Sequence, residues 1–215
     1  RICATARHLA HLVEDHVIQA RVVFPASGYL EMARAAATTP LYDVYFLKLL
    51  VVETSSLVVE CAVIDDRFEI CSNDDAKSVH CSGVLAALAG WQHVDHLSVH
   101  ARVSRLPCDI GSLYESLDVI GLQYGPAYRT LDHAWAISGV GVGQLQTRSP
   151  HLGTHLHPAD LDKGLGSLIL AGGDQLKGFP FAVQKSLLQH TSGTLRAVSY
   201  SRFPRREPLH ALVRS

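Results

Sequence analysis

The sequence lacks a long apolar run, an excess of either charge and any closely spaced pair of cysteines. Its 215 residues carry 19 Lys and Arg against 20 Asp and Glu, which gives a net charge of −1. This balance provides no basic surface for nucleic acid, so we expect no such partner. The longest apolar runs, FLKLLVV and GVLAALAGW, are too short to span a bilayer, and we expect no membrane insertion.

The cysteines are few, odd in number and scattered, and no CxxC motif is present. Such a set is typical of small buried thiols rather than of a disulfide framework. We therefore expect a reducing, cytoplasmic compartment. The first residues, RICATARHLAHL, are also too polar for the apolar core of a signal peptide. The five cysteines are Cys3, Cys61, Cys71, Cys81 and Cys108.

The remaining composition is that of a globular chain, with 47% hydrophobic and 18% charged residues. The pattern divides into two halves of similar content, residues 1–90 and 108–215, joined by a polar, histidine-bearing linker over 91–107. In each half several strand-like runs accompany one central helix. This arrangement predicts an α+β fold rather than a doubly wound parallel sheet.

Several polar residues and one proline mark where the helices are expected to begin. Ser27 is a predicted N-cap with Glu31 in the first turn that follows, and Ser112 and Glu115 have the spacing of a capping box. Pro158 stands where a first helical residue is expected. Neither Ser27 nor its surroundings form the elbow of a serine nucleophile.

The stretch HVIQARVVFP places His16 at the start of a predicted apolar strand that ends at Pro25. Taken alone, these residues favour a half-buried histidine with one ring nitrogen hydrogen-bonded.

Four blocks in the chain resemble a polyketide synthase dehydratase domain, a relative of the dehydratase of animal-type fatty acid synthases. The blocks are HVIQARVVFPASGYLEMA, GLQYGPAYRTL, HPADLD and GFPFAVQKSLLQH, and they occur in the family's order and spacing from about Leu12 to about Phe203. The resemblance implies a double hot-dog fold, in which two sheets each wrap around a central helix.

The resemblance also implies a reaction and the residues that perform it. The family eliminates water from a 3-hydroxyacyl thioester, with a histidine as base and an aspartate as partner acid. The matching positions are His16 in the motif HxxxGxxxxP and Asp162 in HPxxLD. A neutral imidazole suits removal of the α-proton, and a carboxyl group suits proton delivery to the departing oxygen. The implied substrate-binding residues are Pro25, Ser27, Gly28, Tyr124, Gly125, Pro126, His157 and Pro158.

Three positions depart from the family's motifs. Ala20 replaces the glycine of the first motif, and a glycine in a strand marks either a bulge or a close approach of another group, so the added methyl group is expected to shift His16 or to narrow the substrate tunnel. Tyr128 replaces a phenylalanine. Gly166 replaces a Gln or His that, four residues after Asp162 on a helix, would hydrogen-bond the acid. We expect Asp162 to be less well oriented and the activity to be reduced.

Two histidine clusters raise the question of a metal site. His93, His96 and His100 form the first, and His151, His155 and His157 form the second. No cysteines or consistent carboxylates accompany them, so we predict no metal. We also expect no cofactor beyond the phosphopantetheine arm of an acyl carrier protein.

Two classes of function stay open at this point. The first is a dehydratase that works with an acyl carrier protein and neighbouring synthase domains, with a homodimer as an open alternative. The second is a weakly active or inactive structural module of a megasynthase. An isomerase or cyclase that uses the same His/Asp pair is a variant of the first.

Overall fold

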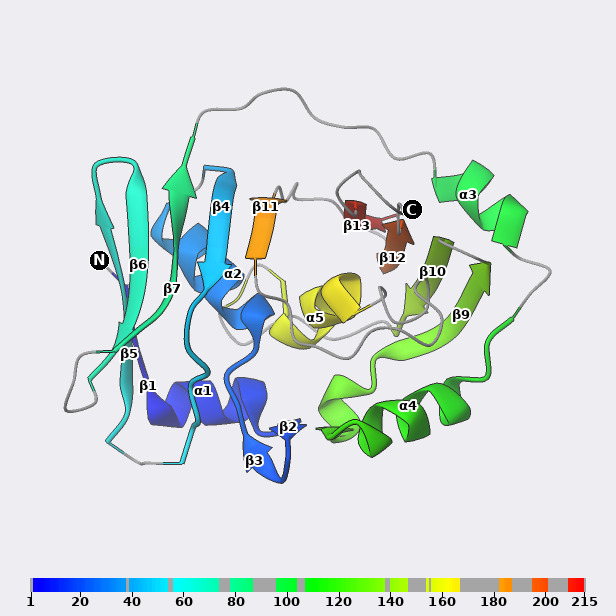
Figure 1. The fold of residues 1–215 in the computed structure, drawn as a ribbon, viewed down its shortest axis with the longest axis horizontal. Helices are drawn as coiled ribbons and strands as arrows, with labels where there is room; N and C mark the ends of the chain where they lie inside the picture. The colour runs from blue at the N-terminus through cyan, green and yellow to red at the C-terminus, as the bar shows by residue number, and fades with distance from the viewer. Residues whose placement is uncertain are drawn as a thin grey trace.

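The computed structural model describes most of the chain as an α+β fold, as the sequence predicts (Figure 1). The described residues are 2–37, 39–53, 56–73, 78–86, 96–103, 107–137, 140–146, 154, 156–166, 182–186, 195–200 and 209–214.

The described part contains five α-helices, one 3₁₀ helix and thirteen strands. The helices are α1 (Ala6–Val13), α2 (Ala26–Ala36), α3 (His96–Val103), α4 (Ile110–Val119), α5 (Pro158–Gly166) and the 3₁₀ helix η1 (Pro126–Tyr128). The strands are β1 (Ile2–Thr5), β2 (His16–Ile18), β3 (Arg21–Val22), β4 (Leu41–Phe46), β5 (Val58–Ile64), β6 (Arg67–Ser72), β7 (Val79–Leu85), β8 (Leu122–Tyr124), β9 (Leu131–Ile137), β10 (Val140–Leu145), β11 (Ala182–Ser186), β12 (Leu195–Tyr200) and β13 (Leu209–Arg214).

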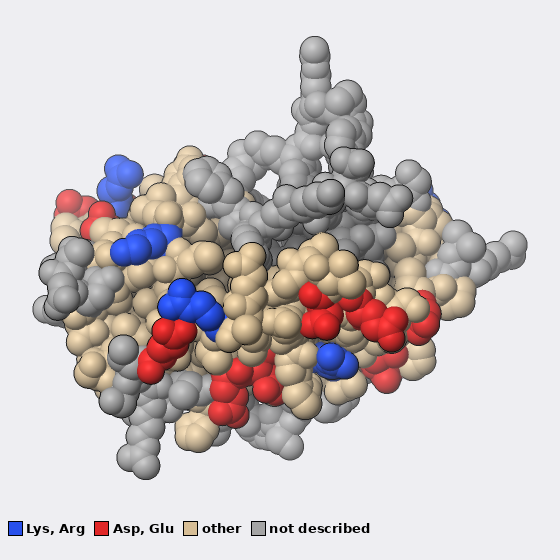
Figure 2. Space-filling model, turned by 60° about the horizontal axis from the view of Figure 1, so that its bottom comes forward, with Lys and Arg blue, Asp and Glu red and all other residues tan. Residues whose placement is uncertain are grey.

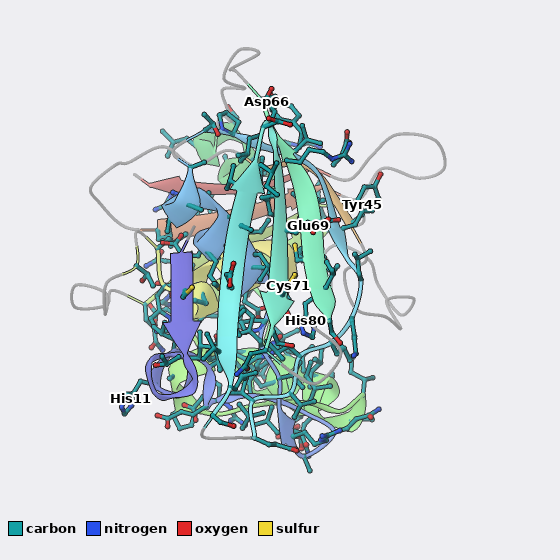
Figure 3. The ribbon with its side chains drawn as sticks, turned by 90° about the vertical axis from the view of Figure 1, so that its left-hand side faces the viewer. His11, Tyr45, Asp66, Glu69, Cys71 and His80 are labelled. Atoms are coloured by element: carbon teal, nitrogen blue, oxygen red, sulfur yellow. The ribbon has the colours of Figure 1, made fainter. Side chains whose placement is uncertain are left out.

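The larger sheet has the order β1-β5-β6-β7-β4-β11 and covers helix α2 (Figure 1). Strand β6 shows why one face of this sheet is buried: Phe68 and Ile70 point inward, whereas Glu69 lies on the outer face that Figure 3 turns toward the viewer. This alternation is the period of a strand with one solvated face. The inward side chains pack with Tyr29 and Leu30 of α2 in the main core.

The second sheet has the order β13-β12-β10-β9, and helix α3 packs against it. Val99 and Val103 of α3 pack against Val142 and Val198 of this sheet. The predicted linker over 91–107 therefore contains a helix, while its role as a boundary between halves stays a prediction. Strand β11, from the second half of the chain, pairs with β4 of the first sheet.

A third sheet of three short strands, β3-β2-β8, joins the two halves of the chain. Strand β2 pairs antiparallel with β8, so that His16 lies opposite Tyr124 and Ile18 opposite Leu122. Residues that are far apart in the sequence are thereby set side by side by backbone hydrogen bonds.

The single apolar strand predicted from His16 to Pro25 is wrong, because the chain folds back as a hairpin of β2 and β3. Gln19 and Ala20 form the turn with φ angles of 49° and 61°. Two successive left-handed residues are typical of the hairpin turn whose twist matches its strands, and glycine adopts this conformation without a steric penalty. The motif glycine thus corresponds to a turn position here, not to a close approach within a strand.

Two predicted helix starts are also wrong. Pro25 occupies the N-cap of α2, so Ser27 lies inside the first turn and makes no capping hydrogen bond. Glu31 accordingly lies beyond the first turn. Helix α4 is capped by Asp109, whose side chain accepts from the amide of Gly111, and not by a Ser112 capping box. A carboxylate at the N-cap performs the same task one turn earlier.

The face formed by α1, the β2–β3 hairpin and α4 carries acidic side chains gathered over α4 (Figure 2). Asp109, Glu115 and Asp118 are exposed there, whereas Tyr114 and Leu117 point into a second core. Within the described residues, no helix is long and apolar enough to cross a membrane.

The turn at Ala20 gives the first prediction. Ala20→Gly should raise the free energy of unfolding by about 1 kcal/mol, since the left-handed conformation penalises a side chain at this φ. Chemical denaturation of the two proteins measures the difference. The matched control is Ala35→Gly in the exposed part of α2, where glycine should lower stability by about 1 kcal/mol. Equal effects at both positions would contradict the assignment of strain to the turn.

Candidate active site

The position of His16 is set by the hairpin in which it lies. It is the first residue of β2, is only 4% exposed, and brings its Nδ1 to 2.6 Å from the carbonyl oxygen of Val23. A carbonyl oxygen only accepts, so Nδ1 carries the hydrogen in this contact. In the neutral imidazole, Nε2 then has a free lone pair. This is the tautomer that a base acting through Nε2 requires.

Asp162 lies directly beside that nitrogen. Its Oδ1 is 3.9 Å from Nε2 of His16, and the aspartate is itself 8% exposed. The histidine comes from β2 and the aspartate from α5, so only the tertiary fold brings them together. The structure thus brings the two candidate catalytic side chains together. Their separation exceeds a hydrogen bond, which leaves Nε2 and Oδ1 able to face two neighbouring atoms of a substrate.

Two tyrosines enclose the imidazole. The ring centroids of Tyr124 and Tyr128 lie 5.6 and 5.1 Å from that of His16. Tyr128 is fully buried, and its hydroxyl donates to the carbonyl of Leu12 in α1 at 3.1 Å. The tyrosine that replaces the family's phenylalanine therefore satisfies its extra polar atom, as a buried hydroxyl must.

Burial controls the protonation of this histidine. Removal of the ring from water lowers the pKa of His16 below its usual 6.5, against the opposing effects of the Asp162 carboxylate and the Val23 carbonyl. The nearby Lys163 ammonium lowers this pKa further. His16 is thus held neutral at neutral pH, ready to accept a proton.

Lys163 is a component of the site that sequence reasoning missed. The residue is 4% exposed, and its Nζ donates to Oδ2 of Asp162 at 3.4 Å. The ammonium also lies 3.3 Å from the ring centroid of Tyr124. The sequence offered only a lysine at a variable position next to an acid, the usual sign of a solvated surface. The Lys163 ammonium therefore holds the Asp162 carboxylate by a hydrogen bond. Gly166, where the family has a Gln or His, is the last residue of α5.

Asp15 is a second residue that the sequence did not single out. Its backbone carbonyl accepts from the amide of Gly125 at 2.9 Å, and its carboxylate accepts from the amide of Ala127 at 2.5 Å. A Cβ on Gly125 would lie 2.5 Å from Cγ of Asp15. The glycine of the YGP block is therefore required by the close approach of the residue that precedes His16. Pro126 follows as the first residue of η1.

The HP block forms the start of α5. The amide of Ala159 donates to Nδ1 of His157 at 3.1 Å, and Pro158 is the first helical residue, as predicted. His157 thus acts as a cap that holds the helix bearing Asp162. Its ring centroid lies 6.3 Å from that of Tyr128. A role of His157 in substrate binding stays a prediction.

The first turn of α2 contains the other predicted binding residues. Gly28 donates its amide to the carbonyl of Pro25 at 2.9 Å, and a Cβ on Gly28 would meet the ring of Phe24 at 2.8 Å. Ser27 is fully buried, and its hydroxyl has no hydrogen-bond partner among the described residues. The Gly28 amide thus serves the helix itself. Substrate contacts of Pro25, Ser27 and Gly28 stay predictions.

The two histidine clusters fall largely on parts of the chain that are not described. His93, His151 and His155 lie outside the described residues. Over the part of the chain that the structure describes, no group of three His, Cys, Asp or Glu side chains is placed to hold a metal ion. The five cysteines are free thiols.

Comparison with known families identifies the class of this domain. The family models described as "Polyketide synthase dehydratase domain" and "Polyketide synthase dehydratase N-terminal domain" match residues 5–73 and 92–184. Together they cover more than half of the chain. The chain belongs to the polyketide synthase dehydratase family.

Curated relatives are very large synthases. The chain is 30% identical over 199 residues to mycoketide-CoA synthase of Mycobacterium tuberculosis, an alignment that covers 84% of this chain and 5% of that protein. It is 29% identical over 177 residues to polyketide synthase ThaG of Burkholderia thailandensis, covering 72% of this chain and 3% of that protein. The chain therefore spans only a few per cent of the length of these relatives.

Solved structures show the same double hot-dog fold. The dehydratase domain from the CurF module of curacin polyketide synthase matches with a TM-score of 0.81 at 21% identity, covering 99% of this chain and 85% of that one. The CurK dehydratase matches with a TM-score of 0.81 at 21% identity, covering 99% of this chain and 84% of that one. Its two structures carry a His-to-Phe and an Asp-to-Asn replacement, and each is titled an inactive mutant.

The contact between Gly125 and Asp15 gives a prediction for stability. Gly125→Ala should lower the free energy of unfolding by about 1–3 kcal/mol, because the new Cβ displaces the carboxylate that holds η1. Thermal and chemical denaturation measure this loss. Gly111→Ala is the matched control, since a Cβ there meets Asp109 at an ordinary 3.4 Å on an exposed helix. A Gly125→Ala protein as stable as this control would contradict the close approach.

The burial of His16 gives a prediction for its titration. An NMR titration should place its pKa below 6.5, with the resonance assigned by its absence in His16→Gln. The unfolded chain regains the ordinary value, so it binds the proton first as the pH falls. The contribution of His16 to stability is therefore present above pH 6.5 and is lost as the pH falls toward the folded pKa. A pKa at or above 6.5 would contradict the buried, neutral imidazole.

Proposed function

We propose that this chain is the dehydratase domain of a polyketide synthase and that it eliminates water from a 3-hydroxyacyl thioester to give a 2-enoyl thioester. The proposal rests on one observation: the free Nε2 of His16 and Oδ1 of Asp162 lie 3.9 Å apart in a buried site. In the substrate, the α-carbon and the β-oxygen are separated by two bonds. Two groups at this spacing are able to reach the α-proton and the hydroxyl at the same time.

The steps follow from the geometry. His16 takes the α-proton through Nε2, while its Nδ1–H stays on the Val23 carbonyl and steadies the ring. The electron pair of the broken C–H bond forms the new double bond, and the β-hydroxyl leaves as water after it receives a proton from the Asp162 side of the site. Burial keeps His16 neutral before the reaction, so it is available as a base.

The relatives support both the reaction and the setting. The CurK dehydratase is titled inactive when a histidine or an aspartate is replaced, which is the result expected for a His/Asp pair. The curated relatives are multidomain synthases, so we propose that neighbouring synthase domains and an acyl carrier protein are the partners of this chain. The carrier's phosphopantetheine arm would present the substrate, and no other cofactor is required.

A purely structural module is the less favoured alternative. The departures at Ala20 and Gly166 support it, but the first lies in an exposed turn and the second at the end of α5. Neither removes a group from the reacting pair. A buried histidine and aspartate with no reaction to perform would be a costly element of a structural domain.

The test is an assay in which mass spectrometry monitors the conversion of 3-hydroxybutyryl-pantetheine to the enoyl product. His16→Ala and Asp162→Asn should each lower turnover by about 10²–10⁴-fold, because each removes one proton-transfer group. The chain offers a matched control in the exposed pair of His133 and Asp132, whose side chains lie 3.0 Å apart. His133→Ala and Asp132→Asn should retain wild-type rates. Wild-type turnover in His16→Ala would assign the chemistry elsewhere.

A further inference from the structure

Lys163 is a buried lysine inside the site. It is 4% exposed, although a lysine is rarely fully buried unless it is paired. Burial of an ammonium costs several kcal/mol or more, so its placement beside a reacting carboxylate indicates a role there. The proposed function requires a proton for the departing hydroxyl. The Lys163 ammonium carries a transferable proton in its ordinary charged state.

The carboxylate of Asp162 links Lys163 to the base. Oδ1 faces Nε2 of His16 at 3.9 Å, and Oδ2 accepts from Nζ of Lys163 at 3.4 Å. The carboxylate therefore lies between the imidazole and the ammonium, with one oxygen near each. In an ion pair of this kind the ammonium, and not the carboxylate, holds the acidic proton. The carboxylate is placed to accept a proton at one oxygen and release one at the other.

Aromatic rings hold the ammonium from two other elements. Nζ lies 3.3 Å from the ring centroid of Tyr124 in β8 and 5.7 Å from that of Tyr114 in α4. The face of a tyrosine ring attracts a cation, which stabilises the charged form of Lys163. Burial and the Asp162 carboxylate raise the pKa of Tyr124 well above 10, so its phenol keeps its proton. The titratable groups that act on Lys163 include Asp162 of α5, His16 of β2, Tyr114 of α4 and Tyr124 of β8.

We propose that Lys163 is the proton donor of this site and that Asp162 relays a proton from His16 back to it. This rests on the proposed dehydratase function. As His16 removes the α-proton, the C–H electron pair forms the double bond and the C–O bond breaks. The oxygen takes its electron pair and one proton from Nζ, and leaves as water. The imidazolium and the neutral amine that result are restored when the proton passes from Nε2 through the Asp162 carboxylate to Nζ.

Two substitutions separate proton donation from simple support of Asp162. Lys163→Arg keeps a cation that can hydrogen-bond Asp162, but a guanidinium does not release its proton. Lys163→Met removes the charge and keeps an unbranched apolar chain. Each is assayed with 3-hydroxybutyryl-pantetheine and with 3-chlorobutyryl-pantetheine, whose chloride leaves without a proton, after subtraction of the uncatalysed elimination.

Both variants should lose about 10²-fold or more in turnover of the hydroxy substrate and stay within a few-fold of wild type on the chloro substrate. His16→Ala should lose both activities. Wild-type dehydration by Lys163→Arg would overturn the proposal and leave Lys163 as a support for Asp162. Equal losses on both substrates would overturn it too, since they indicate a structural defect. If wild type eliminates nothing from either substrate, the dehydratase proposal fails, and the role of Lys163 with it.

An NMR titration of His16 tests the geometry without turnover. The ammonium disfavours protonation of the imidazole, so Lys163→Met should raise the pKa of His16 relative to wild type. Lys163→Arg, which retains the charge, should leave this pKa close to the wild-type value. An unchanged pKa in Lys163→Met would show that the ammonium does not act on His16 and would overturn the relay.

Discussion

The pairing of β2 with β8 is the constraint on which the site depends. It sets His16 opposite Tyr124 and joins the two halves of the chain in one three-stranded sheet. Asp15, the residue before β2, strengthens this junction through the amides of Gly125 and Ala127. Once the junction forms, the hairpin directs the imidazole inward. Helix α5, held at its start by His157, then places Asp162 beside the imidazole.

The chemistry of the site follows from burial more than from any unusual residue. Removal from water keeps His16 neutral. It also strengthens the electrostatic interactions of the remaining charges relative to those at the surface. The exposed pair of His133 and Asp132 shows the contrast, since the same two residue types in closer contact there lie in solvent. Burial within the fold distinguishes the His16 and Asp162 pair from its surface counterpart.

The sequence predicted much of this arrangement because motif residues and periodicity carry it. The α+β class and the helix start at Pro158 are present as predicted, and His16 and Asp162 lie close together. The hairpin was missed because the apolar run from Val17 to Phe24 has no glycine or proline to mark a turn. Ser27 resembled an N-cap because capping preferences are judged from residue type and near neighbours in the sequence. The observed start of α2 depends instead on the direction of the chain at Pro25, after the hairpin.

The sequence by itself determined the family, the α+β class and the two residues proposed to exchange protons, since these depend on residue type and order along the chain. Only the tertiary structure decided that Lys163 lies inside the site and that Asp15 holds the junction. A lysine beside an aspartate is normally solvated, and helical geometry alone would direct neighbouring side chains apart. The contact of Lys163 with the Tyr124 ring and that of the Asp15 carboxylate with the Ala127 amide both join segments distant in sequence, so only packing of the folded chain brings these groups together.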